Sequence, residues 1–281
     1  MSHSTEHNSR PEQSATLFIA ASETDSNLYY ATRFIAPDPF IYLEVKGERL
    51  MVMSDLEVDR ARNQATVDRV LSYSELERRA KSQGVKDPGT IDVIHLVLQD
   101  AGLKDILVPP TFPFLHASRL QEMGYRLRTK RDPFYEQRVM KSDDEVRHIE
   151  AAQRATETAV AAAHQTLRRA EIRDNVLWLD GEILTSERVK KLINVALMEC
   201  DCVAQHTIVA GGEQACDPHD EGSGPLPAHR SIIFDVFPRS AGTRYFADMS
   251  RTVVRGTPSP ELTRLYHAVK DAQEEAITKI R

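Results

Sequence analysis

The segment that most constrains this chain is residues 231–256, SIIFDVFPRSAGTRYFADMSRTVVRG, in which two apolar runs each lead to an aspartate. The first run ends at Asp235, a turn containing Pro238 and Gly242 follows, and the second run reaches Asp248. This pattern is typical of two paired β-strands that carry one carboxylate each. Because neighbouring carboxylates repel each other, a divalent cation between them would stabilise the arrangement. The segment therefore indicates a metal-dependent hydrolytic site.

A structural interpretation stays open beside this one. Asp235 and Asp248 are thirteen positions apart, and one of them could cap a turn while the other pairs with Arg251. On spacing alone, this structural interpretation is favoured.

Composition narrows the class of protein. With 281 residues, 41% of them hydrophobic, the chain is long enough for two domains with buried cores. Its net charge of −6 gives no basic footprint for nucleic acid or a membrane surface, and no apolar run reaches the length of a membrane span. We expect a cytoplasmic protein with no nucleic-acid or membrane partner, and a disordered tail over residues 1–14.

The three cysteines are too few for a secreted disulfide framework. Cys200, Cys202, Cys216 and His219 have spacings close to those of zinc ligands. Free thiols in a reducing compartment are the favoured interpretation, and a structural zinc site is the alternative.

Residues 15–138 alternate short apolar runs with amphipathic stretches, which predicts an α/β domain with a largely covered sheet. Strands are expected at 16–21, 40–45, 49–53, 106–108 and 125–129, and helices at 55–63, 73–82, 90–101 and 112–123. No phosphate-binding loop or nucleophile elbow occurs in this half.

A second domain is expected over residues 139–281. Ser142 and Glu145 form a capping-box pattern that begins a long helix, and a second helix is expected at 186–199. Residues 177–179 suggest an apolar linker, and residues 207–210 a short strand. Ser259 and Pro260 begin a last helix with an apolar stripe that we expect to be buried.

One string of residues resembles a known family. It reads Asp248-Met249-Ser250-Arg251-Thr252, follows a strand ending in Asp235, and is preceded by Pro218-His219 and Gly224-Pro225-Leu226. The arrangement resembles the first half of the metal site in the M24 metallopeptidases, which have the pita-bread fold. That family includes Xaa-Pro aminopeptidases, prolidases, methionine aminopeptidases and the metal-free creatinases. Residues 15–138 resemble, more loosely, the creatinase-type N-terminal domain, and residues 139–281 the first part of the catalytic domain.

The resemblance implies a function and a set of site residues. Asp235 and Asp248 would be metal ligands for two divalent ions, Mn, Co or Zn, which activate a hydroxide for peptide hydrolysis. His219 would be catalytic and steady the developing oxyanion. The creatinase-like domain implies a peptidase for Xaa-Pro bonds, with short proline-containing peptides as substrates and a homodimer as the assembly.

The chain also departs from the family pattern. The family site has five ligands, and the His and two Glu that complete it would follow beyond residue 281, so we expect the chain to be incomplete. The turn between the two aspartates is slightly longer than in common members. The alternative function is a non-catalytic pita-bread module that binds peptides or proteins, or a metal-free creatinase-like hydrolase.

Overall fold

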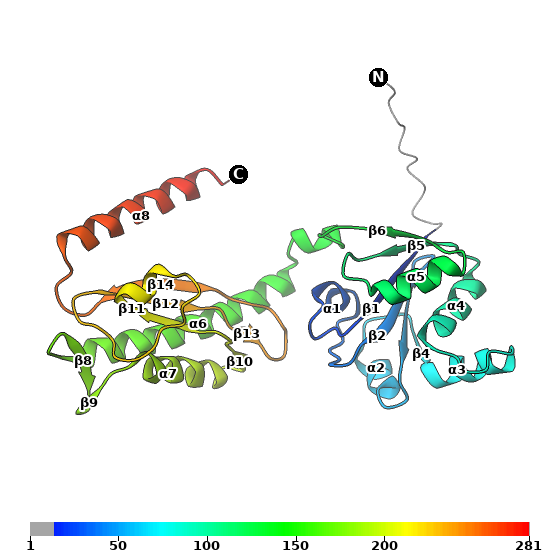
Figure 1. Cartoon of the computed structure of the whole chain (residues 1–281), viewed down its shortest axis with the longest axis horizontal. Helices are drawn as coiled ribbons and strands as arrows, with labels where there is room; N and C mark the ends of the chain where they lie inside the picture. The colour runs from blue at the N-terminus through cyan, green and yellow to red at the C-terminus, as the bar shows by residue number, and fades with distance from the viewer. Residues whose placement is uncertain (1–13, 281) are drawn as a thin grey trace, which may run out of the picture. The chain divides into compact units, whose positions relative to one another are not determined.

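The computed structural model describes residues 14–280 of the chain (Figure 1). It divides into two compact units, Met1–Met140 and Lys141–Arg281. The tail expected over residues 1–14 lies outside the described residues, except for Ser14, which begins the first strand.

The first unit is built on a six-stranded mixed sheet with the strand order β4-β3-β2-β1-β5-β6. Strands β1 and β2 are antiparallel, as are β2 and β3, whereas β5 runs parallel to both β1 and β6. The strands are β1 (Ser14–Ala20), β2 (Phe40–Val45), β3 (Glu48–Met53), β4 (Arg69–Ser72), β5 (Asp105–Val108) and β6 (Arg126–Thr129). The helices are α1 (Ser26–Thr32), α2 (Val58–Gln64), α3 (Tyr73–Ser82), α4 (Thr90–Ala101) and α5 (Phe114–Glu122), followed by the short helix η2 (Glu136–Val139).

Both faces of this sheet are covered, as the α/β prediction requires. Leu17 and Phe18 are neighbours on β1 and therefore point to opposite faces, yet both are fully buried. Leu17 belongs to a core that α4 completes with Ile94, and Phe18 belongs to a second core with Phe34. Strand β4 was not expected from the sequence.

The second unit contains a three-stranded antiparallel sheet in the order β11-β12-β14. A smaller sheet, β7-β8-β9, and the pair β10-β13 accompany it. The helices are α6 (Asp143–Arg169), α7 (Ser186–Met198), η3 (Gly212–Cys216) and α8 (Pro260–Thr278). The strands are β7 (Glu171–Arg173), β8 (Val176–Leu179), β9 (Glu182–Ile183), β10 (Cys202–Val203), β11 (Ile208–Gly211), β12 (Ser231–Val236), β13 (Arg239–Ser240) and β14 (Met249–Val254).

Helix α6 begins at the predicted capping box. The Ser142 amide donates to Glu145 Oε2 at 2.9 Å, and the Glu145 amide donates to Ser142 Oγ at 3.4 Å. Small residues on one face of α6, among them Ala159 and Ala163, are fully buried and let the helix approach the core closely. In that core they join Phe234 of β12. The apolar linker expected at 177–179 is wrong, because these residues belong to β8 and pair with β7 and β9.

Helix α8 begins as predicted, but the expected burial of its stripe is wrong. The Leu262 amide donates to Ser259 Oγ at 3.2 Å, and Pro260 occupies the first turn. None of the helix's residues is buried, and Leu265 and Val269 are 61% and 62% exposed. Within residues 14–280, no element covers this stripe.

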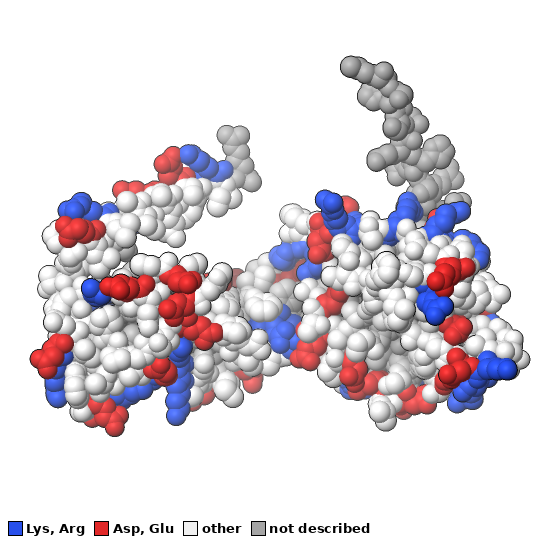
Figure 2. All heavy atoms as spheres, in the orientation of Figure 1, with Lys and Arg blue, Asp and Glu red and all other residues white. Residues whose placement is uncertain are grey.

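The described residues contain no helix that is both long and apolar enough to span a membrane. Lys and Arg side chains are interspersed with Asp and Glu on the face shown in Figure 2, without a large basic field.

Candidate functional site

The two predicted carboxylates lie on the same face of the sheet. Val236 of β12 pairs with Met249 of β14, and both side chains are buried. Because side chains alternate along a strand, Asp235 and its partner Ser250 point to the opposite face. Asp248 immediately precedes Met249 and therefore lies on the face of Asp235. The residues that fill the core side of β12 are Ile232, Phe234 and Val236.

The electrostatics of this face reflect the closeness of the two carboxylates. Partial burial and the charge of Asp235 raise the pKa of Asp248 above its usual value. The Ser250 hydroxyl donates to Asp235 Oδ1 at 2.5 Å, which fixes one carboxylate oxygen. A cation between the two aspartates would relieve the repulsion by Asp235, which is the smaller of the two causes that raise the Asp248 pKa.

The structural alternative, in which Arg251 neutralises an aspartate, finds no support in the described part of the chain. Arg251 Nη1 donates to the Ser250 carbonyl at 2.8 Å, and no ion pair links Arg251 to Asp235 or Asp248 there. The two carboxylates thus remain available as oxygen ligands.

These residues fit a divalent cation as two of its oxygen ligands, because Mn, Zn and related ions accept carboxylate oxygens. Residues 14–280 contain no group of three or more His, Cys, Asp or Glu side chains that could hold a metal. Asp235 and Asp248 therefore form part of a coordination sphere, and water or further ligands would have to fill the remaining positions.

His219 lies on an exposed loop that follows η3. Its amide donates to Asp217 Oδ1 at 3.0 Å, which forms a local turn. Within the described residues, the His219 imidazole makes no hydrogen bond to either aspartate. The structure therefore brings Asp235 and Asp248 together, but it does not bring His219 into contact with them.

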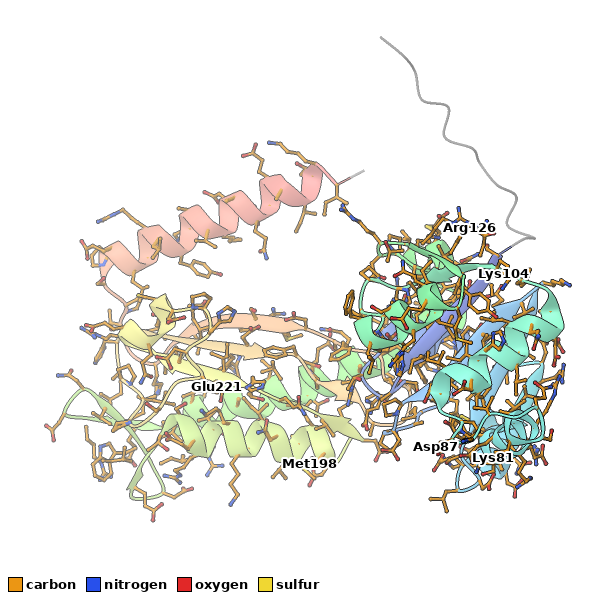
Figure 3. The ribbon with its side chains drawn as sticks, turned by 45° about the vertical axis from the view of Figure 1, so that its right-hand side comes forward. Lys81, Asp87, Lys104, Arg126, Met198 and Glu221 are labelled. Atoms are coloured by element: carbon orange, nitrogen blue, oxygen red, sulfur yellow. The ribbon has the colours of Figure 1, made fainter. Side chains whose placement is uncertain are left out.

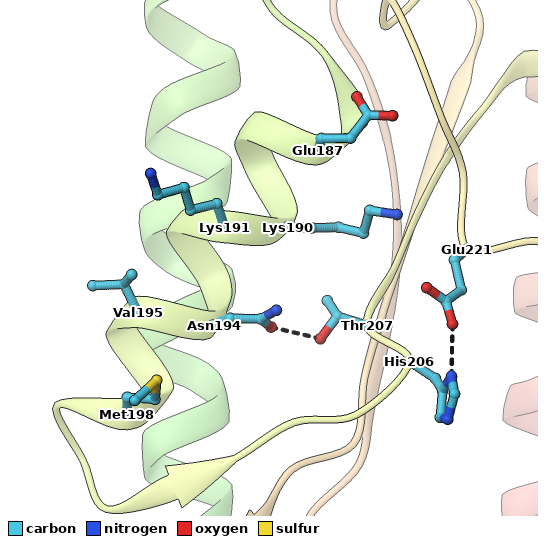
Figure 4. A pocket seen from close by; sticks show the side chains of 9 residues that line it. All are labelled: Glu187, Lys190, Lys191, Asn194, Val195, Met198, His206, Thr207 and Glu221. Atoms are coloured by element: carbon cyan, nitrogen blue, oxygen red, sulfur yellow. Dashed lines mark hydrogen bonds and ion pairs between the residues drawn. The ribbon is translucent and has the colours of Figure 1, made fainter.

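The loop that carries His219 is anchored to β11 and α7 (Figure 4). The Val209 amide donates to the Glu221 carbonyl at 3.0 Å, and Glu221 Oε1 lies 2.7 Å from His206 Nδ1. Lys190 of α7 donates to the Gly222 carbonyl at 2.9 Å. Between α7 and this loop lies a pocket of about 410 Å³ (Figure 4). Figure 3 labels Met198 and Glu221, two of the residues that line it. These bonds fix the position of the loop relative to the sheet.

The zinc alternative is not supported. Cys200 and Cys216 are exposed whereas Cys202 is buried, and burial raises the pKa of the Cys202 thiol, which disfavours the thiolate that zinc requires. No cysteine and histidine cluster occurs in the described range.

Two partners of the site were missed by the sequence reasoning. Ser250 could have been found from the strand period, because it lies two residues after Asp248 on the same face. The Tyr245 hydroxyl donates to Glu145 Oε1 at 2.6 Å and ties the turn between the aspartates to the start of α6. No local signal indicates this second contact, since the two residues are 100 positions apart.

The fold and site together define a class: a creatinase-like α/β domain followed by a pita-bread domain with carboxylates on one sheet face. A solved Xaa-Pro dipeptidase from Bacillus anthracis matches with a TM-score of 0.76 at 16% identity, covering 95% of this chain and 67% of that one. An X-Pro aminopeptidase from Thermotoga maritima gives 0.73 at 20% identity, with 94% and 69% covered. A prolidase from Pyrococcus horikoshii gives 0.71 at 19% identity, with 94% and 67% covered. These likenesses show the fold.

Sequence comparison adds a family match. Residues 147–281, just under half of the chain, match the model of metallopeptidase family M24. An uncharacterized peptidase of Staphylococcus saprophyticus is 24% identical over 267 residues, which cover 92% of this chain and 68% of that protein. One from Staphylococcus epidermidis is 30% identical over 146 residues, which cover 51% of this chain and 38% of that protein. The chain thus spans about two thirds of the first relative, and the second match is confined to little over a third of that protein.

Proposed function

We propose that this chain is part of a metal-dependent peptidase that hydrolyses Xaa-Pro bonds, either at the N-terminus of peptides or in dipeptides. The observation that carries the proposal is the pair of carboxylates, Asp235 and Asp248, on one face of β12 and β14. The match of residues 147–281 to the M24 metallopeptidase model supports peptide hydrolysis. The Xaa-Pro preference draws its support from the names of the structures that share the fold.

The residues of this chain would divide the work in the following way. Asp235 and Asp248 would hold two divalent ions, Mn, Co or Zn, and bound ions would supply the Lewis acidity that makes water nucleophilic at neutral pH. Ser250 would hold the Asp235 carboxylate in one orientation. His219 would donate a hydrogen bond to the carbonyl oxygen of the substrate as negative charge develops there.

Partners and location belong to the same proposal. The substrates would be short peptides with proline in the second position, and the protein would work as a homodimer in the cytoplasm.

Metal binding tests the proposal directly. We expect Asp248→Asn to weaken Mn²⁺ binding by at least about tenfold, because the amide removes a charged ligand from a two-carboxylate site. Isothermal titration calorimetry on the whole chain measures this. Asp180→Asn is the matched control, since Asp180 pairs with Arg169 elsewhere on the unit, and it should bind Mn²⁺ like the parent protein. Equal Mn²⁺ affinity in the parent and Asp248→Asn proteins would contradict the ligand assignment.

An activity assay separates the proposal from its alternative. Release of proline from an Xaa-Pro dipeptide with added Mn²⁺, lost in Asp248→Asn, would support the peptidase. Binding of the dipeptide without cleavage, unaffected by Mn²⁺, would favour a non-catalytic binding module.

A further inference from the structure

A further cavity in the second unit, Lys141–Arg281, lies where the end of α6 passes the end of β14. The two elements lie side by side in Figure 1, and the cavity between them has a volume of about 270 Å³. Its lining residues are His164, Leu167, Arg168, Val253, Val254 and Arg255. Val254 is six residues beyond Asp248, so along the strand the cavity lies about 20 Å from the carboxylate pair. It is therefore separate from the candidate metal site.

The lining is basic and carries no acidic residue. Within residues 14–280, Arg168 forms no ion pair. Arg255 donates from Nε to the Ala170 carbonyl at 3.0 Å, and its two terminal nitrogens have no partner in the same range. Two guanidinium groups thus line one small cavity without a neutralising carboxylate.

Two acidic residues in the segment that follows α6 are already paired elsewhere. Asp180 lies 3.6 Å from Arg169, and Glu171 lies 2.6 Å from Arg173. Neither acid lines the cavity. Rearrangement of these pairs would be needed before either one could neutralise Arg168 or Arg255.

His164 adds a further polar group to the cavity. Its Nε2 atom is buried and has no hydrogen-bond partner among the described residues, although buried polar atoms are usually satisfied. Burial first, and then the charges of Arg168 and Arg251, lower the pKa of the His164 imidazole. Of the two lining arginines, Arg168 therefore acts electrostatically on a third lining residue.

The dipole of helix α6 accounts for only part of the positive charge that Arg168 and Arg255 bring to the cavity. Cations near the C-terminal end of a helix are favoured by the helix dipole, and Arg168 lies in the last turn of α6. The dipole corresponds to roughly half an elementary charge, which is too small to balance two guanidinium groups.

We propose that this cavity binds a small oxyanion of the phosphate class, either free phosphate or the phosphate group of a monoester. Guanidinium groups match the oxygen geometry of phosphate and form charge-assisted hydrogen bonds to it. The imidazole of His164 can donate or accept the further hydrogen bond that its Nε2 atom lacks. Leu167 and Val253 supply an apolar wall against which the organic part of a monoester can pack.

Calorimetric titration of the whole chain with inorganic phosphate at pH 7 and constant ionic strength tests the proposal. We expect saturable binding at one site, weakened about tenfold or more in Arg168→Gln and in Arg255→Gln, because each variant removes a charge-assisted contact. Arg169→Gln is the matched control. It lies next to Arg168 on α6 but pairs with Asp180, so its affinity for phosphate should stay within about twofold of the parent.

A second readout follows His164 by NMR. Bound phosphate should raise the midpoint of the imidazole titration in the parent protein and leave it unchanged in Arg168→Gln. A parallel titration with phenyl phosphate distinguishes the sources: tighter binding than inorganic phosphate indicates a monoester, and equal or weaker binding indicates free phosphate. The proposal is overturned if phosphate gives no saturable heat, or if Arg169→Gln weakens binding as much as Arg168→Gln does.

Discussion

At the residue scale, the chemistry of β12 and β14 depends on alternate positions of two strands. Phe234 and Met249 face the core, whereas Asp235 and Ser250 face the other side. The same alternation that packs the core therefore places a hydroxyl beside a carboxylate. The contact is a short hydrogen bond, in which Ser250 Oγ lies 2.5 Å from Asp235 Oδ1.

Ser250 should therefore influence metal binding without being a ligand. We expect Ser250→Ala to weaken Mn²⁺ binding by about tenfold, since groups that orient a metal ligand typically contribute that much. Ser250→Thr keeps the hydroxyl and should restore most of the affinity. The measurement is calorimetric Mn²⁺ binding, which does not depend on turnover. If Ser250→Ala binds as tightly as the parent, the hydroxyl plays no part in orienting Asp235.

At the element scale, the loop that carries His219 owes its path to one glycine. Gly222 has a φ of +78°, and a Cβ at this position would overlap the carbonyl oxygen of Val209 in β11. Only glycine lets the loop backbone pass so close to the strand. The bonds from Glu221 and Gly222 to β11 and α7 then hold the loop in place.

Gly222→Ala should accordingly disrupt this loop. We expect a loss of about 2 kcal/mol or more in the free energy of unfolding, because the substitution combines a strained backbone with a clash against a strand. Gly224→Ala is the matched control: its φ is +69°, but its Cβ would meet open space, so about 1 kcal/mol is expected. Urea denaturation followed by circular dichroism measures both. Similar losses for the two variants would show that the contact with Val209 is unimportant.

The elements also show what the sequence could and could not predict. Helix α4 and the start of α6 follow from local patterns, an apolar period and a capping box, and both are confirmed. The assignment of 177–179 as a linker failed because a four-residue strand with neighbours on both sides has no local signature of its own. The pairing of Asp235 with Ser250 was within reach of the strand period, whereas the bond from Tyr245 to Glu145 depends on tertiary structure.

At the scale of the whole molecule, α8 differs from the other long helices in what surrounds it. Its apolar stripe is as regular as that of α7, yet α7 buries Val189, Ile193 and Leu197, whereas α8 buries none of its residues. An amphipathic pattern predicts that a helix has an apolar face, but it does not predict whether another element covers that face. Prediction of burial failed here for that reason, while prediction of the helix itself succeeded.

This difference leads to a test on the stability of the chain. Leu265→Ser combined with Val269→Ser should change the free energy of unfolding by no more than about 0.5 kcal/mol, because both side chains are already more than half exposed. Leu197→Ala in α7 is the comparison variant, and it should lose about 2–5 kcal/mol because its side chain is fully buried in the core. Urea denaturation of the 281-residue chain at low protein concentration measures all three proteins. A large loss in the α8 double variant would mean that the stripe is covered in solution, by another part of the chain or by a second copy. Repeating the measurement at higher protein concentration would separate these two cases, since only association between copies makes the stability depend on concentration.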